Sequence, residues 1–480
     1  MPQVHRPPTC GHWYPADPFA LRDMLDERFT ASLERSDAHL FEGALGCVVP
    51  HAGLAYSGGV AAAAFHLIRS ARRVILLGFC HQHPLEGVRT PDIGAYETPL
   101  GEIEVEACDF PRMPESQLCD HSLEMQLPLL RYACPEARVI PLYVGRLTSE
   151  ARAQAAARLR AYLDGSTAIL ASSDFTHFGD AFGFHPFAAD AHAPERIRAL
   201  DQEAIDAAAS LDPDWFLETL RTTRATVCGY LPIQLLLATL REWPEEIYGR
   251  LLDYQTSAEI TGSYDSSVSY AALAFLPASA YRLSEADGAA LVSGARNAIE
   301  LYQRTGLRKP PAATGSAALG RRMGVFVSLH QQGELRGCIG ARLSTLPLSR
   351  LTPLMALRAA LDDPRFQPLA PGEPECDIEV SVLTPMKRVH DPAGIVPGVH
   401  GVYVESKSQD GLLLRQVAAE RGWDSEELLS ALARKAGLPR NVYTASGTRL
   451  SVFQAQIFHR DSTGGVADSL TTSRNTSGRA

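Results

Sequence analysis

The sequence lacks the features that mark disulfide-rich, zinc-ribbon and membrane-spanning proteins. Its nine cysteines are an odd number and include no C-x-x-C pair, which argues against a disulfide framework and a zinc ribbon. The uncharged apolar run at residues 225–240 is broken by Gly229 and Pro232 and is too short to cross a bilayer. The opening residues, MPQVHRPPTCGHWYP, contain no apolar signal core. We therefore expect a cytoplasmic protein with reduced thiols and no membrane association.

Positive charge is also scarce. The formal net charge is −10 at pH 7, which argues against a general nucleic-acid binder, because such proteins usually carry a basic face. With 45% hydrophobic and 21% charged residues, the composition is typical of a globular protein. A chain of 480 residues is too long for one ordinary core, so at least two domains are expected.

The pattern of the chain changes near residues 279–290. Before this point, residues 1–278 alternate apolar runs with helical stretches, which predicts an α/β domain around a largely parallel sheet. Residues 284–461 mix alternating strands with helices and predict a separate α+β domain. Residues 462–480 have too little apolar content to bury and are expected to be disordered. The strands expected in the first domain lie at 46–51, 72–81, 137–145, 167–179 and 267–276.

Polar side chains follow three of these strands at the point where each apolar run stops. His51 and His81 follow the first two, and Asp174 and His177 follow the run AILASS. Because the carboxyl ends of parallel strands face one crevice, these groups favour a shared metal or catalytic site. Cys228 stands at the start of a predicted helix, a position that favours the thiolate. Taken singly, each histidine also fits a hydrogen-bonded loop residue, and Cys228 fits a small buried hydrophobe.

Several segments in this half resemble, in order, the signature segments of the Memo family. They are PHAGLAYSGG, LGFCHQHP, DHSLEMQLPLL, SSDFTHFG, TVCGYLPI and YDSSVSYAALAF, and WYPADP resembles the family's opening motif. The resemblance is collinear over roughly residues 5–276. It implies a fold similar to the class III extradiol dioxygenases, the LigB-type non-haem iron enzymes.

The resemblance also implies roles for individual residues. It makes His51, His81 and Cys228 the ligands of one metal ion. Asp174 and His177 would line the same pocket, with His177 as an acid or base and Asp174 orienting it or a bound water. Glu124 and Tyr56 are the substrate-binding residues expected nearby.

The third metal ligand of this chain differs from that of the extradiol dioxygenases, and the identity of the metal depends on it. Those enzymes hold iron(II) with two histidines and a carboxylate, whereas the third position here is the softer thiolate of Cys228. Two histidines and a cysteine also suit zinc with a bound water, or copper. The resemblance to the class III extradiol dioxygenases makes iron(II) the first choice of metal, and zinc and copper are the alternatives.

The segment ELRGCIG, residues 334–340, is the sharpest motif of the second half. Gly337 and Gly340 flank Cys338, which predicts a tight turn that presents the thiol. Arg336 is a nearby cation that would bind an anion or lower the pKa of the thiol. A structural turn around a buried cysteine is the alternative.

ELRGCIG also matches the hallmark of the AMMECR-type domain. DPRFQPL, DIEVSVLTP, GVHGVYVE and RKAGLP follow in that family's order, over about residues 288–460. Within this domain Cys338 is the catalytic candidate, and Arg336 and His400 are the candidate binding residues. Memo-like and AMMECR-like proteins are grouped with a radical-SAM protein as the AmmeMemoRadiSam system, of which this chain resembles the fused B and A components. It has no C-x₃-C-x₂-C cluster motif, so the radical-SAM component is expected to be a separate partner.

Three functions are consistent with these features. The first is a metal-dependent oxidoreductase or dioxygenase that acts on an unknown small molecule. The second is a module that binds a peptide or partner and holds a structural metal. The third is a hydrolase or transferase in which a zinc-bound water attacks a carbonyl group.

Overall fold

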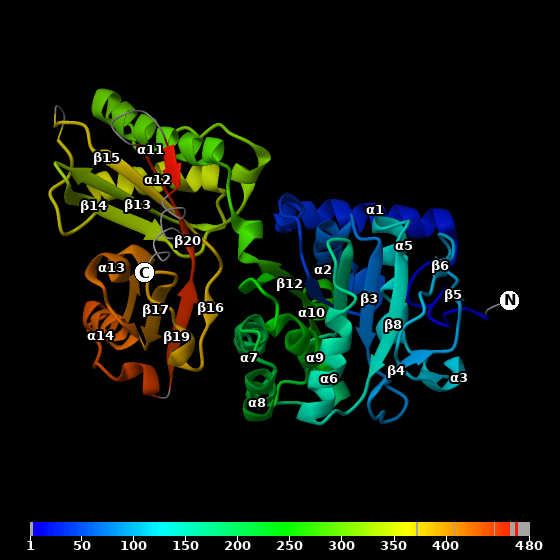
Figure 1. The fold of residues 1–480 in the computed structure, drawn as a ribbon. Coiled ribbons are helices and arrows are strands. Elements are labelled where there is room, and N and C mark those ends of the chain that lie inside the picture. The colour runs from blue at the N-terminus through cyan, green and yellow to red at the C-terminus, as the bar shows by residue number, and fades with distance from the viewer. Residues whose placement is uncertain (1–2, 371–372, 408, 446, 461–465, 469–480) are drawn as a thin grey trace, which may run out of the picture. The chain divides into compact units, whose positions relative to one another are not determined.

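The computed structural model describes residues 3–370, 373–407, 409–445, 447–460 and 466–468 (Figure 1). The chain forms two compact units, Met1–Ala280 and Tyr281–Ala480, called unit 1 and unit 2 below.

Hydrogen bonds on either side of residue 280 fix this boundary. The Ser279 hydroxyl donates to a carboxylate oxygen of Glu245 at 2.8 Å, which holds Ser279 to unit 1. Leu283 is held to unit 2, because its N–H donates to Gln456 Oε1 at 2.8 Å and its carbonyl accepts from Gln456 Nε2 at 3.0 Å. The boundary therefore lies within the region where the sequence pattern changes.

A nine-stranded sheet forms the centre of unit 1. Its spatial order is β10 (His177–Gly179), β12 (Ser266–Pro277), β2 (Gly46–Val49), β9 (Thr167–Ser172), β3 (Arg73–Gly78), β8 (Arg138–Val144), β4 (Val88–Pro91) and β7 (Arg112–Met113), and β11 (Ile247–Thr256) pairs with β12. β2, β9, β3 and β8 run parallel to one another. β12 is antiparallel to β2, and β4 is antiparallel to β8. The α/β class with a parallel central sheet is thus confirmed.

The central strands are buried along their whole length, as their sequences predict. Every residue of β2 and β9 is buried, and so is every residue of β3 after Arg73. Successive side chains of a strand point to opposite faces, so continuous burial requires helices on both faces. The helices of unit 1 are α1 (Pro18–Arg35), α2 (Leu54–Ile68), α3 (Glu115–Leu118), α4 (His121–Glu124), α5 (Leu127–Ala133), α6 (Ser149–Arg160), α7 (Ala193–Ala209), α8 (Pro213–Thr223), α9 (Tyr230–Arg241) and α10 (Ser257–Thr261).

Two groups of helices cover this sheet. α2 packs against β12, β11 and β2 and is itself contacted by α1 and α5, whereas α9 packs against β9, β3 and β8 and is contacted by α6 and α8 (Figure 1). A small separate sheet consists of β1 (Val4–His5), β5 (Ala95–Tyr96) and β6 (Ile103–Glu104). It ties the start of the chain to the loops beyond β4.

Unit 2 contains two antiparallel sheets, which agrees with the expected α+β class. The first has the order β14 (Glu334–Ala341), β13 (Gly324–Gln331), β15 (Asp377–Leu383), β20 (Ala455–Arg460) and β21 (Val466–Asp468), and the second has the order β16 (Lys387–Arg388), β19 (Thr448–Phe453), β17 (Gly401–Ser406) and β18 (Gln409–Leu413). The helices are α11 (Glu285–Thr305), α12 (Leu348–Leu361), α13 (Arg415–Arg421) and α14 (Ser425–Lys435). α11 and α12 pack on each other and on the first sheet, and α14 packs on the second.

The segment ELRGCIG is not the tight turn that its glycines predict. It forms most of β14, and the turn lies before it at Gln332 and Gly333, whose φ angles are 54° and 82°. Gly337 is needed for a different reason: a Cβ atom there would lie 2.2 Å from the Ala359 carbonyl oxygen of α12. The glycine therefore permits a strand and a helix to approach closely.

The tail expected to be disordered, residues 462–480, lies outside the described residues except for β21, which pairs with β20. Within the described part of the chain, no helix combines the length and the apolar character needed to cross a membrane.

We predict that the two units fold independently. Residues 1–280 and residues 281–480, produced as separate polypeptides, should each unfold cooperatively, because each unit contains its own sheets and buried core. Circular dichroism during urea unfolding measures this, and limited proteolysis of the whole chain should cut between the bonds that hold Ser279 and Leu283. If both polypeptides are unfolded, the boundary is wrong or the two units depend on each other.

Candidate metal centre

Three loops that follow parallel strands of unit 1 meet at one edge of the sheet. His51 follows β2, His81 follows β3 and Asp174 follows β9, and Cys228 lies just before α9. One ligand atom from each of His51, His81 and Cys228 lies within 4.8 Å of the other two. The structure thus brings together the three residues that the sequence analysis names as ligands.

His51 is held on both its main chain and its ring. Its N–H donates to Asp174 Oδ1 at 2.8 Å, and its Nδ1 lies 3.1 Å from Ser172 Oγ at the end of β9. Its Nε2 lies 3.4 Å from the sulfur of Cys228. The ring is only 3% exposed, so these contacts fix which nitrogen faces the cluster.

His81 is oriented by Asp120, a residue that the sequence analysis does not single out. Asp120 Oδ2 accepts the His81 N–H at 2.9 Å, and Oδ1 lies 2.7 Å from His81 Nδ1. Burial alone would raise the pKa of Asp120, but the His81 hydrogen bond and the charge of His121 lower it to about 2. An ionised carboxylate only accepts hydrogen bonds, so Nδ1 carries the proton and Nε2 of His81 keeps its lone pair.

Cys228 is placed by the close approach of its loop to the end of β9. A Cβ atom on Gly229 would lie 2.2 Å from the Ser172 carbonyl oxygen, so only glycine fits there. The Gly229 N–H donates to Ser173 Oγ at 2.9 Å, and the Asp174 N–H donates to the Cys228 sulfur at 3.2 Å. These contacts direct the sulfur toward His51.

The pKa of the Cys228 thiol is shifted in the direction opposite to the one that its sequence position predicts. Its position before a helix predicts a stabilised thiolate, but burial raises the pKa of Cys228 well above its usual value, and the Asp174 carboxylate raises it further. Burial likewise lowers the pKa of His51, with the neighbouring His121 and His81 adding to the effect. Without a cation, the site therefore favours a neutral thiol and a neutral imidazole.

Asp174 and His177 lie at the same edge of the sheet. Asp174 is buried, which raises the pKa of its carboxyl group. His177 Nδ1 lies 2.8 Å from the Phe175 carbonyl oxygen and 3.1 Å from that of Thr226. Because carbonyl oxygens only accept, Nδ1 carries the proton and Nε2 is the basic nitrogen of His177.

His121 is a fourth imidazole at the cluster that sequence reasoning misses. Its ring stacks on His81 with 4.0 Å between centroids and lies 5.6 Å from the His51 ring. His81, Asp120 and His121 form a second group whose ligand atoms lie within 4.8 Å of one another. The signal is the Asp120-His121 pair in DHSLEMQ, where the aspartate accepts the Ser122 N–H and caps α4.

Glu124 and Tyr56 are the two residues of unit 1 that the sequence analysis expects to bind substrate. One of them is buried and the other is exposed. Glu124 is buried, and its carboxylate contacts His5 Nε2 at 2.9 Å and accepts from Thr9 Oγ1 at 3.2 Å. It therefore holds the start of the chain, and its carboxylate is engaged there. Tyr56 is 42% exposed on the first turn of α2.

In unit 2, Cys338 is held by the DPRF segment and not by Arg336. Its N–H donates to Asp363 Oδ2 at 2.8 Å, its carbonyl accepts from Arg365 at 3.3 Å, and the Ser328 hydroxyl donates to its sulfur at 3.3 Å. Arg365 also binds Asp363 through two nitrogens and holds the pKa of that carboxyl at about 2. The two signature segments thus bind each other, and a catalytic role of Cys338 stays a prediction.

The other two candidates of unit 2 have separate partners. Arg336 Nη2 lies 3.2 Å from both carboxylate oxygens of Glu373. His400 is buried just before β17 in the second sheet, and its Nδ1 accepts from the Val396 N–H at 3.0 Å. Binding roles for both residues stay predictions as well.

The His5 ion pair gives unit 1 a pH-dependent stability. Burial disfavours the charged ring, but hydrogen bonds to Cys119 and Glu124 raise the pKa of His5 from 6.5 to about 10. The stabilisation should therefore be complete below pH 6.5 and disappear as the pH rises toward 10. We expect His5→Gln to lower the free energy of unfolding of unit 1 by about 3 kcal/mol at pH 6, as for a broken buried ion pair.

Urea unfolding of both proteins at pH 6, 8 and 10 measures this effect. The difference between wild type and His5→Gln should shrink across that range, and His12→Gln, at an exposed position nearby, should behave as wild type. A difference that stays constant with pH would show that the charge of His5 is not what stabilises the fold.

Three relatives each match a little over a third of this chain. A protein from Methanothermobacter thermautotrophicus is 45% identical over 188 residues, which is 37% of this chain and 97% of that protein. Protein PF1979 of Pyrococcus furiosus is 42% identical over 192 residues, 38% of this chain and 91% of that protein. The crystal structure of the uncharacterized protein PH0010 from Pyrococcus horikoshii is 37% identical, covers 39% of this chain and 98% of that one, and has a TM-score of 0.37.

Family models match almost the whole length of the two units. The Memo-like protein family matches residues 5–274, which is more than half of the chain, and the AMMECR1 family matches residues 292–458. The chain therefore belongs to the Memo-like protein family and carries an AMMECR1 domain after its Memo-like domain.

Proposed function

We propose that the Memo-like domain binds one metal ion through His51, His81 and Cys228 and acts as an oxidoreductase on a small molecule. The observation that carries the proposal is the convergence of these three ligand atoms, from three separate loops, within 4.8 Å of one another. Such convergence of imidazole and thiolate groups is typical of transition-metal sites.

The residues around the three ligands support a metal. Asp120 accepts from His81 Nδ1, and Ser172 lies against His51 Nδ1, so both histidines direct Nε2 inward. Metal-binding histidines are usually held in this way by a carboxylate or another polar group on the second ring nitrogen. The low pKa of His51 also keeps the imidazole neutral, which is the form that binds a metal.

A cation would also account for the buried acidic groups. Burial disfavours the anionic forms of Asp174 and Cys228, and the Asp174 carboxylate raises the pKa of Cys228 further. A bound cation reverses this, because opposite charge favours the carboxylate and the thiolate. The site then has the composition of two neutral imidazoles, one thiolate and a nearby carboxylate.

Iron(II) is the metal we propose first, on the likeness of this family to class III extradiol dioxygenases. When bound, it would supply one-electron and dioxygen chemistry. The same donor set accepts zinc or copper, and zinc would favour hydrolytic chemistry. Metal analysis distinguishes these cases.

His177 is the residue we propose for proton transfer. Two carbonyl oxygens fix its Nδ1 proton, so Nε2 is the ring nitrogen left to accept a proton. Asp174 lies between the loops of His51 and Cys228 and would hold a polar substrate group or water. Neither residue is assigned as a ligand.

Variants of the three proposed ligands and of His177 test this assignment. His51→Ala, His81→Ala and Cys228→Ser should each lose most bound metal, because two ligands cannot fix the geometry of the ion. His177→Ala should retain the metal and lose about 10²–10⁴-fold in any turnover, the usual contribution of an acid or base. Inductively coupled plasma mass spectrometry on protein purified without oxygen or chelator gives the metal content.

The matched control is His83→Ala. His83 lies in the same loop as His81, but its Nε2 contacts the Gln117 carbonyl oxygen at 2.7 Å. Its removal should leave the metal content unchanged. Full metal in His51→Ala together with loss in His177→Ala would show that the ligand set is wrong, and a wild-type protein without stoichiometric metal would favour a peptide-binding module.

We also propose that the chain works with a separate radical-SAM protein in an AmmeMemoRadiSam system. The support is the presence of the Memo-like and AMMECR1 domains in one polypeptide, which favours linked steps on one substrate. Gel filtration of this chain mixed with such a protein should show co-elution at micromolar concentrations. Separate elution under those conditions would contradict a stable complex.

A further inference from the structure

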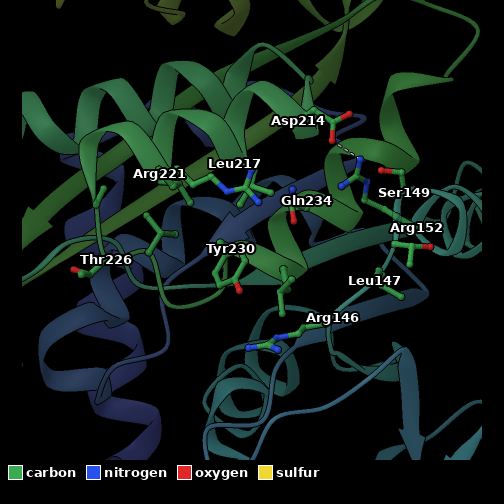
Figure 2. A pocket seen from close by; sticks show the side chains of 15 residues that line it. Arg146, Leu147, Ser149, Arg152, Asp214, Leu217, Arg221, Thr226, Tyr230 and Gln234 are labelled. Carbon is green, nitrogen blue, oxygen red and sulfur yellow. Dashed lines mark hydrogen bonds and ion pairs between the residues drawn. The ribbon is translucent and has the colours of Figure 1, made fainter.

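A pocket of unit 1 is bordered by the segment that leads to Cys228. It has a volume of about 800 Å³ and is open to solvent, a size that fits a small organic molecule. Its walls come from the end of β8, the start of α6, α8 and the start of α9 (Figure 2). None of the three proposed metal ligands lines it.

The charged groups of this pocket are mostly positive. Three arginines, Arg146, Arg152 and Arg221, line it together with one acid, Asp214. The Asp214 carboxylate is bound by Arg152 at 2.5 Å, and the Arg152 side chain is only 11% exposed. The charge of Arg152 is therefore compensated within the wall, which leaves Arg146 and Arg221 to set the charge of the opening.

Arg146 and Arg221 are weakly engaged by the protein. Within the described residues, the Arg146 side chain makes no ion pair or side-chain hydrogen bond. Arg221 lies 3.9 Å from Glu218, and both side chains are about two-thirds exposed, so this pair is weak. Two such guanidinium groups are notable in a chain whose net charge is −10.

The two arginines face the pocket from different sides. Figure 2 shows Arg221, from α8, and Arg146, from the loop after β8, with Tyr230 between them in this view. The guanidinium fork binds phosphate or carboxylate oxygens in pairs. The first turn of α6 also borders the space, and a helix N-terminus adds partial positive charge.

The rest of the wall fits an organic group. Leu147, Leu217 and the ring of Tyr230 supply apolar surface. Gln234 is nearly buried and donates through Nε2 to the Pro213 carbonyl oxygen at 3.0 Å, so its orientation is fixed. A ligand of matching chemistry has an anionic head and a small aromatic or aliphatic body.

The pocket shares a wall with the candidate metal centre. Thr226 lines the pocket, and its hydroxyl oxygen accepts the His177 N–H at 2.7 Å. Its carbonyl oxygen lies 3.1 Å from His177 Nδ1, and Cys228 follows two residues later. A ligand in the pocket would thus contact the segment that positions His177 and Cys228.

We propose that this pocket binds a small organic phosphate, with the phosphate held by Arg146 and Arg221 and the organic part on Tyr230 and Leu217. One guanidinium without an ion pair and one that is only weakly paired match a phosphate dianion better than a singly charged carboxylate. The proposal concerns binding at residues other than the metal ligands, so it stands apart from the proposed metal chemistry.

Isothermal titration calorimetry of the full chain with phenyl phosphate tests the proposal. Arg146→Gln and Arg221→Gln should each raise the dissociation constant at least about tenfold, because each removes charged hydrogen bonds. Arg69→Gln, at an exposed position after α2, should leave it unchanged. Benzoate and inorganic phosphate should bind more weakly than phenyl phosphate, since each lacks one half of the matched chemistry.

Four results would overturn the proposal. One is no binding of phenyl phosphate at millimolar concentration. Another is equal weakening by Arg69→Gln, which would indicate a non-specific charge effect. The third is loss of binding when the protein is treated with chelator while Arg146→Gln and Arg221→Gln bind normally, which would place the phosphate on the metal. Benzoate binding more tightly than phenyl phosphate would replace phosphate by carboxylate as the ligand class.

Discussion

Asp174 is the residue on which the geometry of the candidate site depends. Its carboxylate accepts the main-chain N–H of His51, and its own N–H donates to the sulfur of Cys228. One buried residue at the end of β9 therefore fixes the loop after β2 and the loop before α9 relative to each other. The contact of His51 Nδ1 with Ser172 and the bond from the Gly229 N–H to Ser173 add to these two bonds, and the His51 Nε2 and the Cys228 sulfur lie 3.4 Å apart.

This arrangement has an electrostatic cost that a cation would offset. Burial disfavours the ionised forms of the Asp174 carboxyl group and the Cys228 thiol, and the Asp174 carboxylate raises the pKa of that thiol further. Burial also lowers the pKa of the His51 and His121 imidazoles. Burial of unpaired charge is expensive, and groups in such sites neutralise unless an opposite charge is present. Asp120 and Ser172 contact the Nδ1 atoms of His81 and His51. Contacts of this kind orient metal-binding histidines before the metal binds.

The sequence predicts best those site residues that directly follow a buried strand. Buried apolar runs locate β2, β3 and β9, and the parallel sheet then brings His51, His81 and Asp174 to one edge. Glu124 could not be placed in this way, because its partner His5 is 119 residues away and belongs to a strand of only two residues. Local pattern carries no information about such a pair.

In unit 2, too, local sequence pattern does not predict contacts between separate elements. The glycines of ELRGCIG predict a turn, but Gly337 serves the close contact of β14 with α12, and a Cβ atom on Gly340 would meet Phe326 of β13. α12 itself is absent from the sequence reading, and it contains Pro353, a residue that normally ends a helix. The pairing of Cys338 with the DPRF segment likewise depends on tertiary contacts between residues 25 apart.

The central claim is that one metal ion lies among His51, His81 and Cys228. X-ray absorption spectroscopy at the metal edge, on protein purified without oxygen or chelator, tests it most directly. We predict iron with one sulfur neighbour at about 2.3 Å and nitrogen or oxygen neighbours at about 2.0–2.2 Å, by analogy with protein–zinc bonds. A stoichiometric metal whose spectrum contains no sulfur neighbour would contradict the ligand set.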